Sequence, residues 1–316
     1  MDTAAKPGPA VIPASEVEPP PLGLRELAWR RFRRHKMAMF GLVVLGALIL
    51  YSFGGSLFVS EGYANYTDTS LRLQAPSAAH PFGTDTIGRD ILARTIYGGQ
   101  ISLLIGLTAV TIELLVGILI GALAGYFGGK LDALLMRFTE AMLNIPQIFL
   151  LIVMAKYFSG NVPNINLFGR TLSGSVVVIV MIIGLTSWPY LARIVRAEFL
   201  SIKEREFVLA ARATGTPKFQ IIFRHILPNC VAPIVVAATL GVANAITLEA
   251  YISFLGMGVR PPTATWGNML EGAYSYIETA YWMWLFPGLL IVLIVLSINF
   301  VGDGLRDALD PRSRTV

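Results

Sequence analysis

The sequence is poor in the residue types that carry most metal and hydrolase chemistry. It has 1 cysteine and 3 histidines in 316 residues, and only 14% of its residues are charged. A single cysteine, Cys230, excludes an intrachain disulfide and a thiolate metal cluster, and we expect it to be a small packing residue. The histidines, His35, His80 and His225, are scattered over expected loops. This composition offers no convergent set of catalytic groups.

Motifs for nucleotide or peptide hydrolysis are also missing. The phosphate-binding pattern GxxxxGK[ST] is not met, because Leu131 follows Gly129-Lys130 and Ala124 stands where the first glycine should be. The HExxH zinc motif and the GxSxG nucleophile elbow do not occur either. We therefore predict that the chain is not an enzyme and holds neither a metal nor a cofactor of its own.

Long apolar runs are what the sequence has in abundance. Hydrophobic residues make up 54% of the chain, and its mean hydropathy is +0.63. A membrane-spanning helix needs about 20 largely apolar residues. The candidate spans are Met37–Phe58, Ser102–Phe127, Leu134–Phe158, Ser175–Phe199, Val231–Leu255 and Trp282–Val301. We predict an all-α integral membrane protein of six transmembrane helices, with kinks at Pro146, Pro189 and Pro287.

The distribution of Lys and Arg predicts the orientation of these spans. The segments before the first span, after the second, after the fourth and at the C-terminus are rich in both residues. The other connections hold only a few, namely Arg72, Arg89, Arg94, Arg170 and Arg260. By the positive-inside rule, both termini and the loop after the fourth span are cytoplasmic. The net charge of +5 is then a topology signal, and we expect a lipid bilayer rather than a nucleic acid as partner.

The loop Glu206–Asn229, EFVLAARATGTPKFQIIFRHILPN, predicts a docking element. Glu206–Ala213 should be a helix rich in alanine, ended by Gly215 at positive φ. Pro217 suits the first turn of a second helix, and Pro228 closes the segment. Small residues let a helix approach a partner closely, while basic flanks hold it at a membrane surface. An ordinary interfacial hairpin is the plainer alternative.

This loop resembles the coupling loop, or EAA motif, of bacterial ABC importer permeases. Leu209 replaces the motif's glutamate, and His225 stands at its isoleucine. The resemblance implies contact with an ATPase subunit through Ala210, Ala211, Arg212, Gly215, Thr216, Lys218, Leu227 and Pro228. Arg212, Lys218 and Arg224 would pair with acidic ATPase side chains or with anionic lipid, and both readings stay open.

Two further segments are similar to the dipeptide and oligopeptide branch of these permeases. In His80–Ser102 we expect a turn at Gly83, a cap at Thr84 or Asp85, and a short amphipathic helix. Its similarity to the branch signature rests on Gly83, Thr84, Asp85, Gly88, Arg89 and Asp90. Phe254–Asn268 resembles the outer loop of the same branch through Pro261, Pro262, Trp266 and Gly267, and Gly302–Arg312 resembles the end of its C-type subunit.

The resemblance implies a type I ABC importer transmembrane domain in the bacterial cytoplasmic membrane. It divides the chain into a cytoplasmic tail at 1–36, a first span with an outer segment at 37–100, a permease domain at 101–303 and a tail at 304–316, with the coupling loop at 200–229. The first 22 residues, rich in Pro and Ala, are expected to be disordered and no signal peptide.

Family membership also implies partners and cargo. These are a second homologous permease subunit, two ATPase subunits that bind ATP and magnesium, and an extracytoplasmic binding protein that delivers di- or oligopeptides. Near relatives carry nickel, glutathione-like peptides or oligosaccharides. A secondary transporter or channel is the more distant alternative, although no convincing inverted repeat is visible.

Two carboxylates inside the spans are candidates for the translocation path, because hydrocarbon makes ionisable groups costly. Glu113 lies near the middle of the second span and Glu249 late in the fifth. Glu113 either lines the path or locks helices together. Glu249 either attracts the amino terminus of a peptide or has a structural role. The glycines of the second span suit close helix packing, and these are Gly106, Gly117, Gly121 and Gly125.

Overall fold

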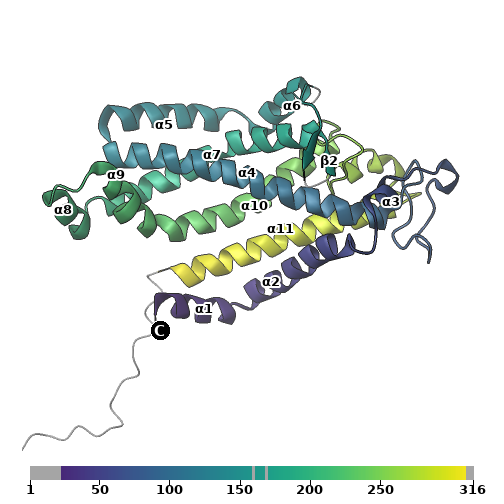
Figure 1. Cartoon of the computed structure of the whole chain (residues 1–316), viewed down its shortest axis with the longest axis horizontal. Helices are drawn as coiled ribbons and strands as arrows, with labels where there is room; N and C mark the ends of the chain where they lie inside the picture. The colour runs from purple at the N-terminus through teal and green to yellow at the C-terminus, as the bar shows by residue number, and fades with distance from the viewer. Residues whose placement is uncertain (1–22, 159–160, 168–169, 311–316) are drawn as a thin grey trace, which may run out of the picture.

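The chain forms an elongated bundle of helices in the computed structural model, which describes residues 23–158, 161–167 and 170–310 (Figure 1). The predicted tail at 1–22 and the last residues, 311–316, lie outside this description. Five helices are long and apolar enough to cross a membrane, or up to six when one bent pair counts as a single span. The predicted all-α membrane architecture is confirmed.

The spanning segments follow the predicted apolar runs. They comprise Lys36–Gly54, which contains α2 (Lys36–Ile49), then α4 (Ile91–Phe127), α7 (Gly174–Ile202), Lys218–Phe254, which contains α9 (Lys218–Gln220) and α10 (Val231–Phe254), and α11 (Trp282–Leu309). The bent pair is α5 (Gly129–Asn144) with α6 (Gln147–Phe158). Shorter elements are α1 (Leu24–Arg34), α3 (Glu61–Asn65), α8 (Glu206–Ala213) and the hairpin of β1 (Ile165–Leu167) and β2 (Arg170–Leu172), which are antiparallel with Ile165 opposite Leu172.

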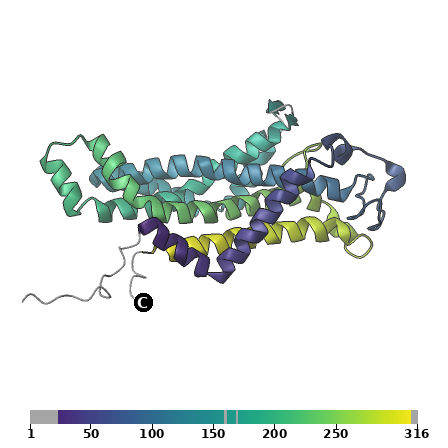
Figure 2. The same ribbon diagram turned by 60° about the horizontal axis from the view of Figure 1, so that its bottom comes forward.

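The two ends of the bundle differ. At one end lie α8 and α9, together with α1 and the end of α11 (Figure 1). There Arg31 Nη1 donates to the Asp310 carbonyl over 3.2 Å, and Phe32 packs with Ala308. At the other end lie α3, the start of α4 and the loop that joins α10 to α11 (Figures 1 and 2). The described ends of the chain therefore lie on the same side of the bundle as α8.

Close packing of α4 on α7 forms the centre of the bundle. Three of the predicted glycines, Gly117, Gly121 and Gly125, face α7 with almost no space for a side chain, whereas Gly106 faces Ile246 of α10. A Cβ at Gly121 would lie 2.5 Å from the Ala192 carbonyl oxygen, and one at Gly125 would lie 2.5 Å from Phe199 Cβ. Small residues allow membrane helices to approach in this way. The predicted packing role of these glycines agrees with the structure.

The third span, predicted as Leu134–Phe158 with a kink at Pro146, is broken at that proline rather than kinked. It is replaced by α5 and α6, whose axes differ by 83°. Ile145 is extended, with φ −80° and ψ 122°, because a residue before proline avoids the helical region. Pro146 therefore ends α5 instead of kinking a continuous helix. Pro189 and Pro287, in contrast, lie inside α7 and α11.

The short amphipathic helix expected between the first two spans is also absent from the described residues. Asp90, rather than Thr84 or Asp85, is the N-cap, and its Oδ1 accepts a hydrogen bond of 2.8 Å from the Ala93 backbone N–H. The helix that begins at Ile91 continues without a break to Phe127, so Asp90 starts the second span itself.

Pro228 does not close the loop after the fourth span. Helical structure runs from Lys218 to Phe254, and Pro228 lies within it, at the start of a tight turn, Leu227–Cys230. The preceding turn, Ile221–Ile226, is widened to a π-helix. Because proline lacks an N–H and its ring crowds the preceding turn, such a local change of helix geometry accommodates it. Pro217 is the N-cap of α9 rather than its first residue.

Candidate functional site

The helix α8 is held firmly on the bundle by its inner face. Val208 is fully buried and Ala211 nearly so, and both pack with Phe199 of α7 and with Ile222 and Ile226. The predicted bounds Glu206–Ala213 are confirmed. Burial of these apolar side chains fixes the position of α8 relative to α7 and to the start of the fifth span.

Gly215 ends this helix in a Schellman motif. Its N–H donates to the Arg212 carbonyl over 3.0 Å, and the Thr216 N–H donates to the Ala211 carbonyl over 3.1 Å. Gly215 has φ +75°, and a Cβ placed there would meet nothing within 4 Å. Glycine is therefore required by the backbone angle and not by crowding. The predicted positive φ is confirmed.

This segment exposes four large apolar side chains, those of Phe207, Leu209, Phe219 and Phe223. Phe219 is 71% exposed, and its ring lies 4.4 Å from that of Phe223. Ala210 is exposed beside them, Pro228 is exposed and Leu227 is half-buried. Single exposed apolar residues are common on protein surfaces. Four large ones on one short loop are instead typical of a contact surface.

Two of the predicted basic contacts also reach back to α4. The Arg212 guanidinium lies 5.6 Å from the Tyr126 ring centroid, and Lys218 Nζ lies 5.9 Å from that of Phe127. Such cation–π contacts join the loop to the end of α4. No local pattern in the sequence predicts this connection, because it depends on the loop folding back on the second span.

An ion pair next to the loop was missed as well. Arg196 of α7 makes a bidentate contact with Asp132 of α5, at 2.5 and 2.7 Å, and Lys203 Nζ donates to the Gly125 carbonyl over 3.0 Å. The fork geometry of Arg and carboxylate is among the stronger polar contacts. These contacts join α4, α5 and α7 at the end of the bundle that carries α8.

The first outer signature folds into a hydrogen-bonded turn. The Thr84 hydroxyl donates to the Leu71 carbonyl over 2.5 Å, and Arg89 Nε donates to Asp85 Oδ2 over 2.6 Å. His80 Nδ1 and Asp90 Oδ2 are 2.8 Å apart.

Gly83 and Gly88 have φ of +73° and +80°, and a Cβ at Gly88 would clash with the Asp68 carbonyl. Hydrogen bonds from Ser70 lower the pKa of the Asp68 carboxyl in the same turn. These residues shape the outer end of the bundle.

The second outer signature meets Glu249. Oε1 of Glu249 accepts hydrogen bonds from the Ser253 and Thr265 hydroxyls, at 2.7 and 2.8 Å, and Oε2 lies 3.5 Å from the Ser102 hydroxyl. Trp266 is fully buried next to this network, and its backbone N–H donates to Ser102 Oγ over 3.2 Å. Glu249 is 1% exposed.

The other members of this signature lie around the network. A Cβ at Gly267 would come within 2.6 Å of Ala250 Cα, so the outer loop lies directly on α10. Pro261 and Pro262 are exposed and joined by a cis peptide bond. The signature therefore attaches the loop between α10 and α11 to the spanning helices α4 and α10.

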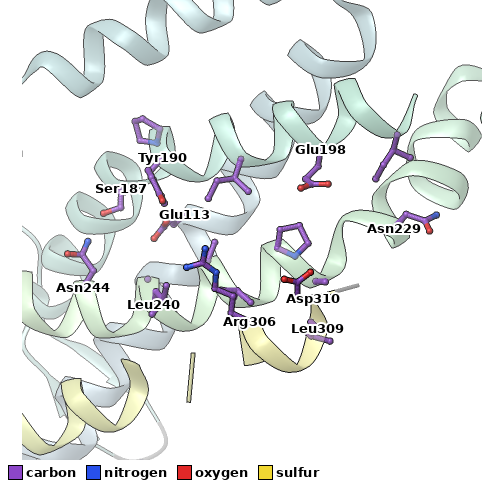
Figure 3. A pocket seen from close by; sticks show the side chains of 18 of the residues that line it. Glu113, Ser187, Tyr190, Glu198, Asn229, Leu240, Asn244, Arg306, Leu309 and Asp310 are labelled. Atoms are coloured by element: carbon purple, nitrogen blue, oxygen red, sulfur yellow. The ribbon is translucent and has the colours of Figure 1, made fainter. Parts of the chain in front are cut away.

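Glu113 lies elsewhere, on a cavity of about 810 Å³ between α4, α7, α10 and the end of α11. Figure 3 shows its side chain beside Ser187 and Tyr190 of α7. Gln147, the first residue of α6, also lines this cavity and donates to the Ser187 hydroxyl over 3.0 Å. The structure therefore separates the two predicted path carboxylates, because Glu249 does not line this cavity.

The chain is thus a bundle of spanning helices with a packed helix–glycine–helix loop at one end. Residues 117–315 match the family described as binding-protein-dependent transport system inner membrane component. Residues 23–76 match the N-terminal TM domain of oligopeptide transport permease C. The chain belongs to this family of non-enzymatic inner-membrane permease subunits.

Named relatives cover nearly the whole chain. It is 41% identical over 288 residues to the dipeptide transport system permease protein DppC of Alkalihalophilus pseudofirmus, covering 91% of this chain and 90% of the relative. It is 45% identical over 285 residues to a putative peptide permease protein of Brucella suis, covering 90% and 89%. It is 40% identical over 289 residues to the oligopeptide transport system permease protein OppC of Haemophilus influenzae, covering 91% and 88%.

Among solved structures, the fold is similar to a chain of the MetNI methionine ABC transporter in an inward-facing conformation. The TM-score is 0.52 at 21% identity, and the match covers 67% of this chain and 94% of that chain. This likeness shows the type I ABC importer transmembrane fold.

Proposed function

We propose that this chain is the C-type transmembrane subunit of an ATP-driven importer of di- and oligopeptides in the bacterial cytoplasmic membrane. The observation that carries the proposal is the α8–Gly215–α9 segment, which packs on the bundle through Val208 and Ala211 and exposes large apolar side chains. The names of the relatives support peptides as the cargo. ATP and magnesium bind to two separate ATPase subunits, one of which docks on this segment.

The orientation follows from charge and from the position of the loop. The basic segments at the chain ends and around α8 belong on the cytoplasmic side. The opposite end, with the two outer signatures, then faces an extracytoplasmic binding protein. A second homologous permease subunit completes the pathway, since the substrate of this family passes between two such subunits.

The coupling mechanism follows from the contacts of α8. Closure of the ATPases displaces α8, and its buried contacts with Phe199 and Ile226 transmit the movement to α7 and to the fifth span. The cavity beside Glu113 is flanked by these same helices, so their displacement alternates access to it. Arg212 and Lys218, which lie over aromatic rings of α4, extend the connection to the second span.

Purification of the chain from its native membrane in mild detergent, with mass spectrometry of what accompanies it, tests this function. We expect a second permease, one or two ATPases and an extracytoplasmic binding protein, and peptides eluted from that binding protein. Elution of nickel or an oligosaccharide instead would refute the peptide assignment. Recovery of this chain alone, under conditions that keep known complexes intact, would favour a channel or secondary transporter.

A further inference from the structure

Glu113 is a buried acidic side chain on the wall of the cavity. It is 9% exposed, and among the described residues none donates a hydrogen bond to its carboxylate or forms an ion pair with it. A carboxylate that is largely removed from water and has no partner in the protein is costly. An unpaired group of this kind, on the wall of a cavity, points to a ligand that supplies the missing donor.

Helix packing fixes the position of this carboxylate at the middle of the bundle. A Cβ at Gly184 of α7 would lie 2.9 Å from the Ala109 carbonyl oxygen, and one at Gly117 would lie 2.8 Å from Leu191 Cδ2. Glu113 is therefore level with Ser187. On the opposite wall, a Cβ at Gly241 of α10 would lie 3.2 Å from Glu113 Oε2, so the carboxylate reaches the surface of α10.

Several polar side chains of the cavity lining are neutral and suited to hydrogen bonding. They are the amide of Gln147, the hydroxyls of Thr186, Ser187 and Tyr190, and the amide of Asn244 (Figure 3). The nearest carboxylate on α7 is that of Glu198. It lies eleven residues after Ser187, which corresponds to about 16 Å along the helix axis. Arg205, Arg306 and Asp310 also line the cavity, and Figure 3 shows the Arg306 guanidinium on the side of Glu113.

We propose that Glu113 binds the ammonium group at the amino terminus of a short peptide within this cavity, while the neutral side chains around it meet the peptide backbone. This proposal rests on the proposed function and names the subsite that recognises its cargo. A single carboxylate matches one ammonium group, whereas a bound metal ion needs several such ligands. The cavity volume, about 810 Å³, is within the range of small-ligand sites, about 300–1,000 Å³.

Charged thiol reagents test the proposal on the complete transporter. Ser187→Cys provides a reporter in the cavity, and Asn244→Cys on α10 provides a second one in case the first does not assemble. The native Cys230 is fully buried. The rates of modification by a cationic and an anionic methanethiosulfonate are compared with Glu113 present and with Glu113→Gln. We expect the change to lower the cation-to-anion rate ratio by about fivefold or more.

Protection by defined peptides identifies the ligand group. Tri-alanine should slow modification of the reporter, N-acetyl-tri-alanine should not, and Glu113→Gln should abolish the protection. Glu198→Gln is the matched control, since it removes another carboxylate of the same cavity, and protection should persist. An unchanged rate ratio in Glu113→Gln, equal protection by both peptides, or reporters closed to both reagents would each overturn the proposal.

The same preparation separates this proposal from the proposed function. ATP-driven uptake by the unmodified complex, reconstituted in liposomes with its binding protein, tests the importer itself. Uptake with no effect of Glu113→Gln on labelling refutes only the subsite. Absence of uptake refutes the importer, whatever the reporters show about the charge of the cavity.

Discussion

At the scale of single residues, the two carboxylates of the spans have different environments. Glu249 accepts two short hydrogen bonds from hydroxyls and lies near a third, whereas Glu113 faces a cavity. Hydroxyl donors are the partners that an internal carboxylate needs, so Glu249 holds α10 to the outer loop. This placement favours the structural role among the two predicted for Glu249. It also moves recognition of a peptide amino terminus to Glu113.

Glu249→Ala should destabilise the protein because it leaves buried hydroxyls without their acceptor. We expect a loss of about 2–4 kcal/mol, seen as a lower midpoint of thermal unfolding of the purified complex, and a smaller loss for Glu249→Gln. Uptake of a peptide with a free amino terminus and of one with a blocked terminus should fall equally in Glu249→Gln. A selective loss of the free peptide, at unchanged thermal stability, would instead assign recognition to Glu249.

At the scale of elements, features that depend on neighbouring residues could be predicted from the sequence. Features that depend on contacts between distant residues could not. The bounds of α8 and the positive φ of Gly215 follow from alanine content and a glycine stop, both of which act within a few residues. The apolar runs likewise predict the spans. The predicted cap, Thr84 or Asp85, is wrong by a few residues, because Asp90 caps the helix and Ile91 after it is buried against Ala273, Trp282 and Met283.

The break at Pro146 illustrates the same limit. A proline in an apolar run permits either a kink or a break. The choice depends on where the second half of the run packs. Gln147 donates to Ser187 of α7, and Leu151 and Ala155 of α6 are buried in the same core as Ile179 and Ile183. These contacts are remote in sequence, so no local pattern predicts them.

Spin labels at Arg137 and Lys156, both exposed, measure the break directly. With the 83° bend, the two backbone positions should be about 21 Å apart, against about 28 Å for a straight helix of the same length. Changing Pro146 to Ala restores a backbone N–H and should move the distribution toward the longer distance. A distance near 28 Å in the unmodified complex would show that the third span is continuous.

At the scale of the whole molecule, the chain joins two specialised ends through a tightly packed centre. One end carries α8 and the described chain ends, and the other carries the loops of the outer signatures (Figures 1 and 2). Between them, α4 and α7 pack so closely that Gly121 and Gly125 leave almost no room for a side chain. Helices held in this way move as a unit, so displacement at α8 reaches the cavity beside Glu113.

The central claim is that the α8–Gly215–α9 segment couples ATP hydrolysis in partner subunits to passage of cargo. Gly215→Val tests it, because a β-branched residue is strained at φ +75° although the space around it is open. Gly272→Val is the matched control. Gly272 has φ +71° and equally open space, but it lies in the loop between α10 and α11, at the opposite end of the bundle.

The decisive measurement is the amount of peptide imported per ATP hydrolysed by the reconstituted complex, with membrane insertion of each variant verified. We predict that Gly215→Val inserts normally but lowers this ratio by about tenfold or more, or releases the ATPases, while Gly272→Val retains the ratio of the unmodified complex. Insertion, assembly and an unchanged ratio in Gly215→Val would contradict the account.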